Sequence, residues 1–181
     1  SEFFENGSYR WEGGTKSADE MTAIYAQWIN DFPIVSIEDP LAEDDPAGML
    51  KFTRAAGDRI EVVADDFICT TASRIQSAAA LGACNTALIK PNQAGTLTET
   101  YAALQAARAA GWESIVSARS GETEDVTIVH LAVGWGVKQL KVGSFSRSER
   151  MAKWNEGLRI AEALGQGGGR LAPRSSFPWG R

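Results

Sequence analysis

Five polar residues, each at the end of a short apolar run, are the candidates for chemistry in this chain. They are Glu38, Asp65, Lys90, Arg119 and Lys141. Carboxylates bind divalent cations, and arginine and lysine bind anionic groups such as phosphate and carboxylate. Two acids and three bases brought to one place would form a site for a metal ion and an anionic substrate.

The spacing of these five residues indicates the elements that must position them. Successive candidates lie 22 to 29 residues apart, which is the length of one strand, one helix and their two loops. Parallel strands need such a crossover, because a hairpin cannot join them. In a barrel of repeated β/α units the C-terminal ends of all strands meet at one face, where catalysis takes place. The pattern therefore predicts an α/β barrel with the candidates on its C-terminal rim.

The helices expected between these strands carry their own signals. A first helix is expected from about Ser17 to Asp31, because Ser17 and Glu20 have the spacing of a capping box. The opening segment up to Gly14 is interpreted as polar and aromatic with turn residues. The remaining helices are expected over 47–56, 72–81, 97–110, 125–134 and 148–164, with C-caps at Gly82, Gly111, Gly134 and Gly165.

Five parallel strands are too few for a closed barrel of this type, which has eight. An open half-barrel leaves two unpaired edges, and the first expected helix has no strand before it. We therefore expect a partial (β/α)8 TIM-type barrel truncated at the N-terminus, as the C-terminal piece of a larger protein. Residues 166–181, rich in glycine, proline and arginine, are predicted to be a flexible tail.

Composition limits which kinds of partner and which cellular compartment are expected. The net charge of −5 argues against a nucleic-acid partner. No run is apolar enough to cross a bilayer, and the first residues do not have the pattern of a signal peptide. Cys69 and Cys84 have no metal-type spacing, so we expect reduced thiols in a cytoplasmic protein, with a disulfide as the alternative.

Five motifs closely resemble the C-terminal barrel of enolase. They are SIEDPLAEDD (36–45), VADDF (63–67), LIKPNQAGTLTET (88–100), SARSGETED (117–125) and KVGSFSRSERMAKWNEGLRI (141–160). The resemblance covers residues 1–165 and implies strands 4 to 8 of that barrel. It implies a lyase that uses Mg²⁺ to eliminate water from 2-phosphoglycerate, giving phosphoenolpyruvate, in a family that is usually homodimeric.

The resemblance also implies roles for the residues on the first three strands. Lys90 matches the catalytic base, which must be neutral to accept a proton, a state that burial and nearby positive charge favour. Glu38 and Asp65 match two of the three Mg²⁺ ligands, and the third would lie upstream of Ser1. Taken alone, Glu38 in Glu38-Asp39-Pro40 is better interpreted as shaping a turn, and Asp65 and Asp66 could cap the next helix.

The last two strands match the substrate-binding residues of the family. Arg119 and Ser120 match the pair that binds the substrate phosphate, and Lys141 matches the lysine that contacts the substrate carboxylate. Without the motifs around them, they could be a polar turn and a solvated lysine.

Two residues depart from the family pattern: Ala118 puts ordinary efficiency in question, and Pro91 fixes the backbone beside Lys90 and could change where that lysine points. Ala118 stands where the family has a histidine that helps bind substrate, and Pro91 stands where valine is usual. A diverged paralogue acting on a related phosphorylated or phosphonate acid is therefore an alternative. The glutamates that protonate the departing hydroxyl lie upstream in the family, so we expect negligible activity from this fragment alone. A non-catalytic, self-associating half-barrel is a further alternative, and a racemase-type lyase ranks last.

Overall fold

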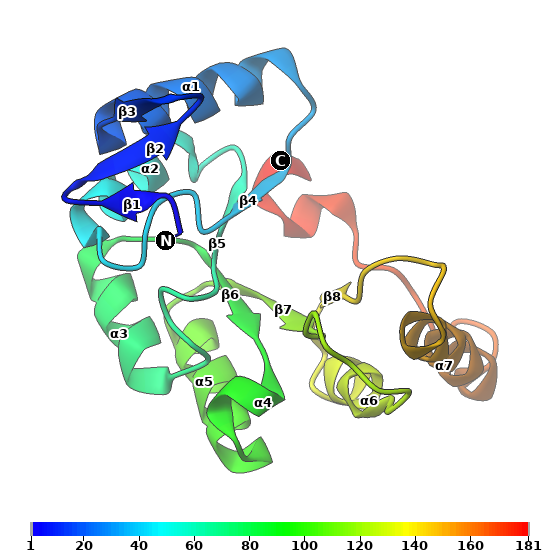
Figure 1. The fold of residues 1–181 in the computed structure, drawn as a ribbon. Helices are drawn as coiled ribbons and strands as arrows, with labels where there is room; N and C mark the ends of the chain where they lie inside the picture. The colour runs from blue at the N-terminus through cyan, green and yellow to red at the C-terminus, as the bar shows by residue number, and fades with distance from the viewer. Residues whose placement is uncertain (1, 181) are drawn as a thin grey trace.

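The computed structural model describes residues 2–180 and contains a curved parallel sheet with helices around its outer face (Figure 1). The sheet order follows the chain, so each strand pairs with the next one in sequence. This arrangement is half of a TIM barrel, as the sequence predicts. The five strands are β4 (Ser36–Glu38), β5 (Glu61–Ala64), β6 (Thr86–Ile89), β7 (Glu113–Ser117) and β8 (Gln139–Lys141).

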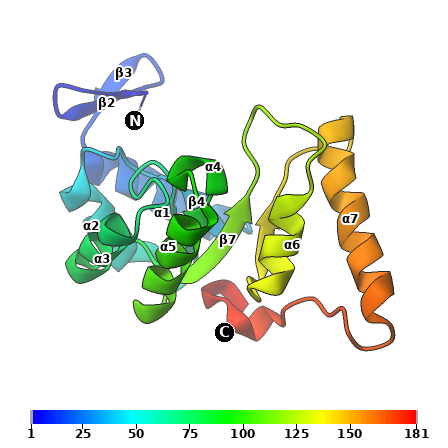
Figure 2. The same ribbon diagram turned by 90° about the horizontal axis from the view of Figure 1, so that it is seen from below.

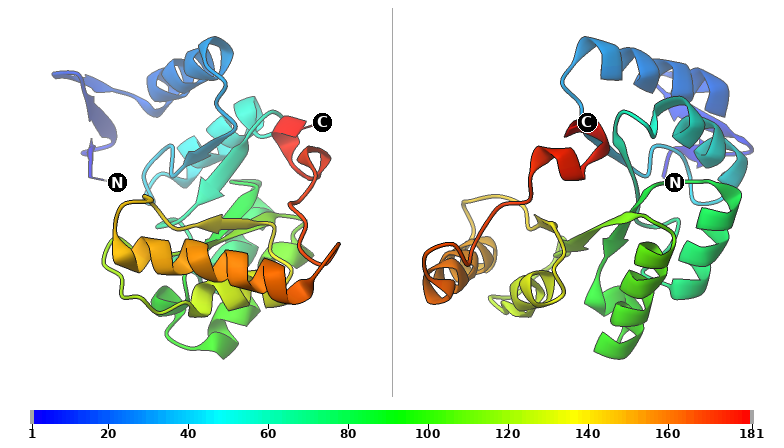
Figure 3. Two further views of the ribbon diagram at one scale, coloured as in Figure 1. Left: turned by 90° about the vertical axis from the view of Figure 1, so that its right-hand side faces the viewer. Right: turned by 180° about the vertical axis from the view of Figure 1, so that it is seen from behind.

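The helices surround the convex side of the sheet and lie close to their predicted positions, except for the four-residue α4, which was not predicted (Figure 3). The predicted capping box begins the first of them: the Glu20 N–H donates to Ser17 Oγ at 3.2 Å, and the Ser17 N–H donates to Glu20 Oε2 at 2.8 Å. The helices are α1 (Ala18–Asp31), α2 (Pro46–Ala56), α3 (Ala72–Leu81), α4 (Pro91–Ala94), α5 (Leu97–Ala109), α6 (Thr127–Gly134) and α7 (Ser148–Leu164).

Three of the four expected C-cap glycines lie at helix ends with a positive φ, and one does not. Gly82 and Gly165 are C-caps with φ of 80° and 69°, and Gly111 follows the cap of α5 with φ of 73°. The prediction for Gly134 was wrong, because Gly134 is still the last residue of α6 and the positive φ falls at Gly136. The chain continues for two more residues before it reverses.

The opening segment is a three-stranded antiparallel meander that the sequence interpretation missed. Its strands are β1 (Phe4–Glu5), β2 (Ser8–Trp11) and β3 (Gly14–Lys16). Both connections are two-residue turns with positive φ at each position, over Asn6-Gly7 and Glu12-Gly13, which is the geometry of type I′ hairpins. The meander lies at one edge of the molecule, near α1 (Figure 2).

The central strands β5 and β6 are buried at every position, as expected for strands that are covered on both faces of a parallel sheet. Val62 and Ile89 belong to the core between the sheet and its helices, together with Phe52 and Ile75. Leu88, the residue before Ile89 on β6, points to the opposite face of the sheet and is also fully buried. The sheet therefore has an inner surface of its own, on the concave side.

The end of the chain returns from α7 to the N-terminal ends of the strands (Figures 1 and 3). It forms two short 3₁₀ turns, over Arg174–Ser176 and Pro178–Gly180. Phe177 is buried and stacks on Trp179 with ring centroids 4.9 Å apart, and Lys138 Nζ lies 5.9 Å from the Phe177 ring. This part of the predicted tail is packed on the sheet, and its flexibility stays a prediction.

Two further findings concern the thiols and the membrane. Cys69 and Cys84 are both free, and Cys84 is buried. Within residues 2–180, no helix has the length and apolar character needed to cross a membrane.

Candidate active site

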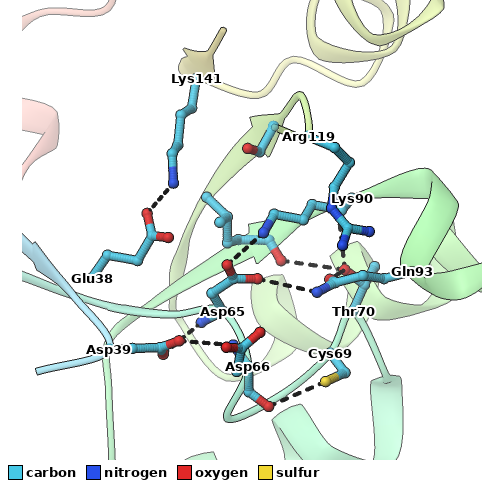
Figure 4. A network of polar contacts seen from close by, with 12 residues as sticks. Glu38, Asp39, Asp65, Asp66, Cys69, Thr70, Lys90, Gln93, Arg119 and Lys141 are labelled. Carbon is cyan, nitrogen blue, oxygen red and sulfur yellow. Dashed lines mark hydrogen bonds and ion pairs between the residues drawn. The ribbon is translucent and has the colours of Figure 1, made fainter. Parts of the chain in front are cut away.

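All five polar candidates lie at the C-terminal rim of the sheet, where the spacing predicts them. Glu38 and Lys141 are the last residues of β4 and β8. Asp65 and Lys90 directly follow β5 and β6, and Arg119 comes two residues after β7. The strands are in register, so these positions meet at one edge (Figure 4).

Lys90 and Asp65 form a nearly buried ion pair at the centre of this rim. Lys90 Nζ donates to Asp65 Oδ2, and the two side chains are only 9% and 11% exposed. Gln93 Nε2 donates to the other carboxylate oxygen at 3.2 Å, and Thr70 Oγ1 donates to Gln93 Oε1 at 2.6 Å. The lysine is therefore directed at one carboxylate within a hydrogen-bonded network.

Pro91, the second departure from the family pattern, has a structural explanation. Lys90 is the N-cap of α4, and Pro91 is the first residue of that helix. Proline suits this position, since its missing N–H would have no partner inside the helix and its φ already fits. The substitution leaves Lys90 directed at Asp65.

A second ion pair joins the two edge strands across the concave side of the sheet. Lys141 Nζ on β8 donates to Glu38 Oε2 on β4, although the two residues are 103 positions apart. These side chains are 48% and 34% exposed, so water reaches this pair far more than it reaches Lys90 and Asp65. The curvature of five strands is enough to bring the first and the last together (Figure 4).

Asp39 is one of the rim residues that the sequence interpretation missed as part of the site. Its Oδ1 accepts the N–H of Asp65 and its Oδ2 accepts the N–H of Asp66, each at 2.9 Å. Burial raises the pKa of Asp39 to about 6, against the opposing effect of these two backbone donors. The Glu38-Asp39-Pro40 motif contained the signal, but only its first acid was considered as more than a turn residue.

Asp39, Asp65 and Asp66 form a compact acidic triad. One carboxylate oxygen from each lies within 4.8 Å of the others. Neither Asp65 nor Asp66 caps the following helix, because the N-cap of α3 is Thr71. Carboxylate oxygens are the ligands that hard cations such as Mg²⁺ prefer, so the triad could hold a metal ion. Glu38 is outside the triad and is paired with Lys141.

Arg119 and Ser120 lie in the loop between β7 and α6. Arg119 Nη1 donates to Asn92 Oδ1 at 3.2 Å, and its backbone N–H donates to Glu122 Oε1 at 2.7 Å. Ala118, where the family pattern has histidine, is 7% exposed, and its N–H donates to the Lys141 carbonyl at 2.9 Å. A methyl group at this position offers no hydrogen bond to a ligand.

The rim thus combines carboxylates, two lysines and an arginine on the face where barrel enzymes bind their substrates. Comparison with known families matches residues 1–174 to the family described as enolase, C-terminal TIM barrel domain. The match spans the whole half-barrel and includes every residue of the rim. The chain therefore belongs to the enolase C-terminal TIM barrel domain family.

Proposed function

We propose that this chain carries the base and the substrate-binding residues of a Mg²⁺-dependent hydro-lyase. In the proposed reaction, 2-phosphoglycerate loses the proton on carbon 2 and the hydroxyl on carbon 3, giving phosphoenolpyruvate and water. The observation that supports this most is the position of Lys90, a nearly buried lysine among carboxylates at the C-terminal rim. The membership of the chain in the enolase C-terminal domain family suggests the same class of reaction.

Each rim residue has a distinct part in this proposal. Lys90, as the neutral amine, takes the proton from carbon 2. Lys141 pairs with the substrate carboxylate, and Arg119 and Ser120 bind the phosphate. A guanidinium and a hydroxyl suit that role, because both donate hydrogen bonds to phosphate oxygens.

The carboxylates of Glu38 and Asp65 would hold Mg²⁺, and the carboxylates of Asp39 and Asp66 lie close to that of Asp65. The donor set fits this ion, since it consists of hard oxygen ligands on one face of the rim. When bound, the cation supplies positive charge that stabilises the charge developing on the substrate carboxylate. Asp39 holds the backbone of Asp65 and Asp66, so it positions one ligand.

A partial reaction tests the base without requiring the whole elimination. Exchange of the carbon-2 proton with deuterium from solvent needs a base but no acid for the departing hydroxyl. We expect the chain with Mg²⁺ to catalyse this exchange in 2-phosphoglycerate, as followed by proton NMR, while net formation of phosphoenolpyruvate stays negligible. Replacing Lys90 with methionine should abolish the exchange.

Lys51 provides the control for that experiment. It is an exposed lysine paired with Asp19, away from the rim, so Lys51→Met removes the same charge and should leave the exchange unchanged. Exchange that persists in Lys90→Met, or a wild-type chain that neither binds 2-phosphoglycerate nor exchanges its proton, would contradict the proposal.

A diverged activity on a related phosphorylated or phosphonate acid is the second candidate, and Ala118 is the observation that favours it. The residue is nearly buried beside Arg119 and presents only a methyl group. Titration of 2-phosphoglycerate and of a phosphonate analogue into the wild-type chain and Ala118→His separates the two candidates. Tighter binding of the phosphonate by wild type, reversed in Ala118→His, would favour the diverged activity.

A further inference from the structure

Helix α7 is attached to the rest of the molecule by buried positive charges. Of its residues, Arg150 and Lys153 are the ones that are buried, with 7% and 1% of their surface exposed. A helix that packs on a domain usually buries an apolar stripe. Lysine and arginine are rarely buried unless their charges are paired or hydrogen-bonded, so the partners of these two residues indicate what the helix is for.

The Arg150 guanidinium binds three backbone carbonyl oxygens behind the rim. Its Nη1 donates to the carbonyls of Arg119 and Val142, and its Nη2 donates to the carbonyl of Ser120, each at 2.8 Å. Two of these acceptors belong to the residues that we propose bind phosphate. The third follows Lys141 at the end of β8, so one side chain joins the exits of two strands.

Lys153 reaches the same loop from one turn further along α7. Its Nζ donates to the Thr123 carbonyl at 2.8 Å and lies 3.0 Å from Glu122 Oε2. The other oxygen of Glu122 accepts the backbone N–H of Arg119. Arg119 is therefore held on both sides of its backbone, by Arg150 at the C=O and by Glu122 with Lys153 at the N–H.

We propose that Arg150 and Lys153 are positioning residues for phosphate recognition. They fix the backbone of Arg119 and Ser120, and their own donors are occupied by protein carbonyls and a carboxylate. This role rests on the proposed function, in which Arg119 and Ser120 bind the substrate phosphate. Orientation matters here because displacing a binding group by about 1 Å can cost up to a hundredfold in rate.

The test compares phosphate recognition with metal binding in the same protein. Binding of 2-phosphoglycerate and of inorganic phosphate is measured by calorimetry with Mg²⁺ present, and Mg²⁺ binding is measured alone. We expect Arg150→Met to raise both phosphate dissociation constants roughly ten- to a hundredfold and to leave the Mg²⁺ constant unchanged. Arg150→Lys keeps the charge but cannot form the same fork of hydrogen bonds, so it should also weaken phosphate binding.

Arg159 provides the matched control on the same helix. It is exposed and pairs with Glu156 at 3.0 Å, so Arg159→Met removes one positive charge from α7 without touching the loop. Phosphate binding should be unchanged in that variant. Amide hydrogen exchange over residues 119–122, measured without ligand, should accelerate in Arg150→Met, Arg150→Lys and Lys153→Met but not in Arg159→Met.

A double-variant comparison decides whether Arg150 acts through the loop. In a protein that already has Arg119→Ala and Ser120→Ala, adding Arg150→Met should weaken phosphate binding no further. Equal weakening with and without those two substitutions would refute the positioning role, as would wild-type affinity in Arg150→Lys. A wild-type chain that binds no phosphate would refute the proposed function, and with it this role.

Discussion

The ion pair between Lys90 and Asp65 gives the sharpest stability prediction. Asp65→Asn keeps the shape of the side chain, and its amide oxygen can still accept a hydrogen bond from Gln93. What it removes is the negative charge opposite the Lys90 ammonium, in a place where the two side chains are only 9% and 11% exposed. The substitution therefore isolates the effect of an unpaired charge from that of lost packing.

The expected cost follows from the burial of that charge. Removing one partner of a buried ion pair costs roughly 3–5 kcal/mol, and we expect about 3 kcal/mol because the pair lies at the rim. For a chain of 181 residues, this corresponds to a fall in melting temperature of roughly 6–12 °C. Adding Lys90→Met should recover much of the loss, since no charge then remains unpaired.

Urea denaturation in the presence of EDTA and of Mg²⁺ measures both consequences. Mg²⁺ at a hundred times its dissociation constant should stabilise the wild-type chain by about 2.7 kcal/mol, and it should leave Asp65→Asn unaffected. The control is Asp19→Asn, which breaks the exposed pair with Lys51 and should leave the free energy of unfolding nearly unchanged. If Asp65→Asn were as stable as Asp19→Asn, the reasoning from burial would be refuted.

Three further predictions concern other parts of the molecule. Burial raises the pKa of Glu61, so the folded state favours the protonated carboxyl, and the free energy of unfolding should fall as pH rises through that pKa. Urea denaturation at a series of pH values should show this decline in the wild-type chain and a flatter profile in Glu61→Gln. Tyr9→Phe removes a hydroxyl that donates to Asp45 and accepts the Ala42 N–H, and should lower the free energy of unfolding by about 1–3 kcal/mol in the same assay. The edge strands β4 and β8 each pair with one neighbour among the described residues, so sedimentation should detect self-association of this 19.5 kDa chain, and a stable monomer would contradict it.

The ends of the strands could be predicted from the sequence because two patterns indicate the same positions. Each apolar run is followed by a polar residue, and the runs recur at the length of one β/α unit, which places Lys90 and Asp65 directly after their strands. The helices between them could be predicted for a similar reason, since α1 has its capping box at Ser17 and Glu20. In both cases the signal is local in sequence.

The N-terminal meander was missed although its signal is also local. Strands of two to four residues are too short to show alternation of polar and apolar residues. The turn chemistry was the better guide, because Asn6-Gly7 is the residue pair that a type I′ hairpin favours. The Asn6-Gly7 pair therefore predicts the first hairpin of the meander even though its strands are too short to be recognised.

The partners of the rim residues could not be predicted, because they depend on curvature and on contacts between distant segments. Nothing near Glu38 in the sequence indicates Lys141, which reaches it only because the sheet curls. The burial of Arg150 could not be predicted either, since a basic residue on a helix rich in charged residues is expected to face solvent. Its burial depends on carbonyl groups that loops on other strands present.

The two rim ion pairs differ in exposure, and that difference bears on how a ligand could enter. Glu38 and Lys141 are about one-third to one-half exposed, and exposed pairs contribute little to stability. Lys90 and Asp65 are nearly buried and are fixed by Gln93 and Thr70. We therefore expect a substrate carboxylate to separate Lys141 from Glu38 at small cost, which frees an acid for the cation. Lys90 should keep its place throughout, because the network that aims it does not depend on the outer pair.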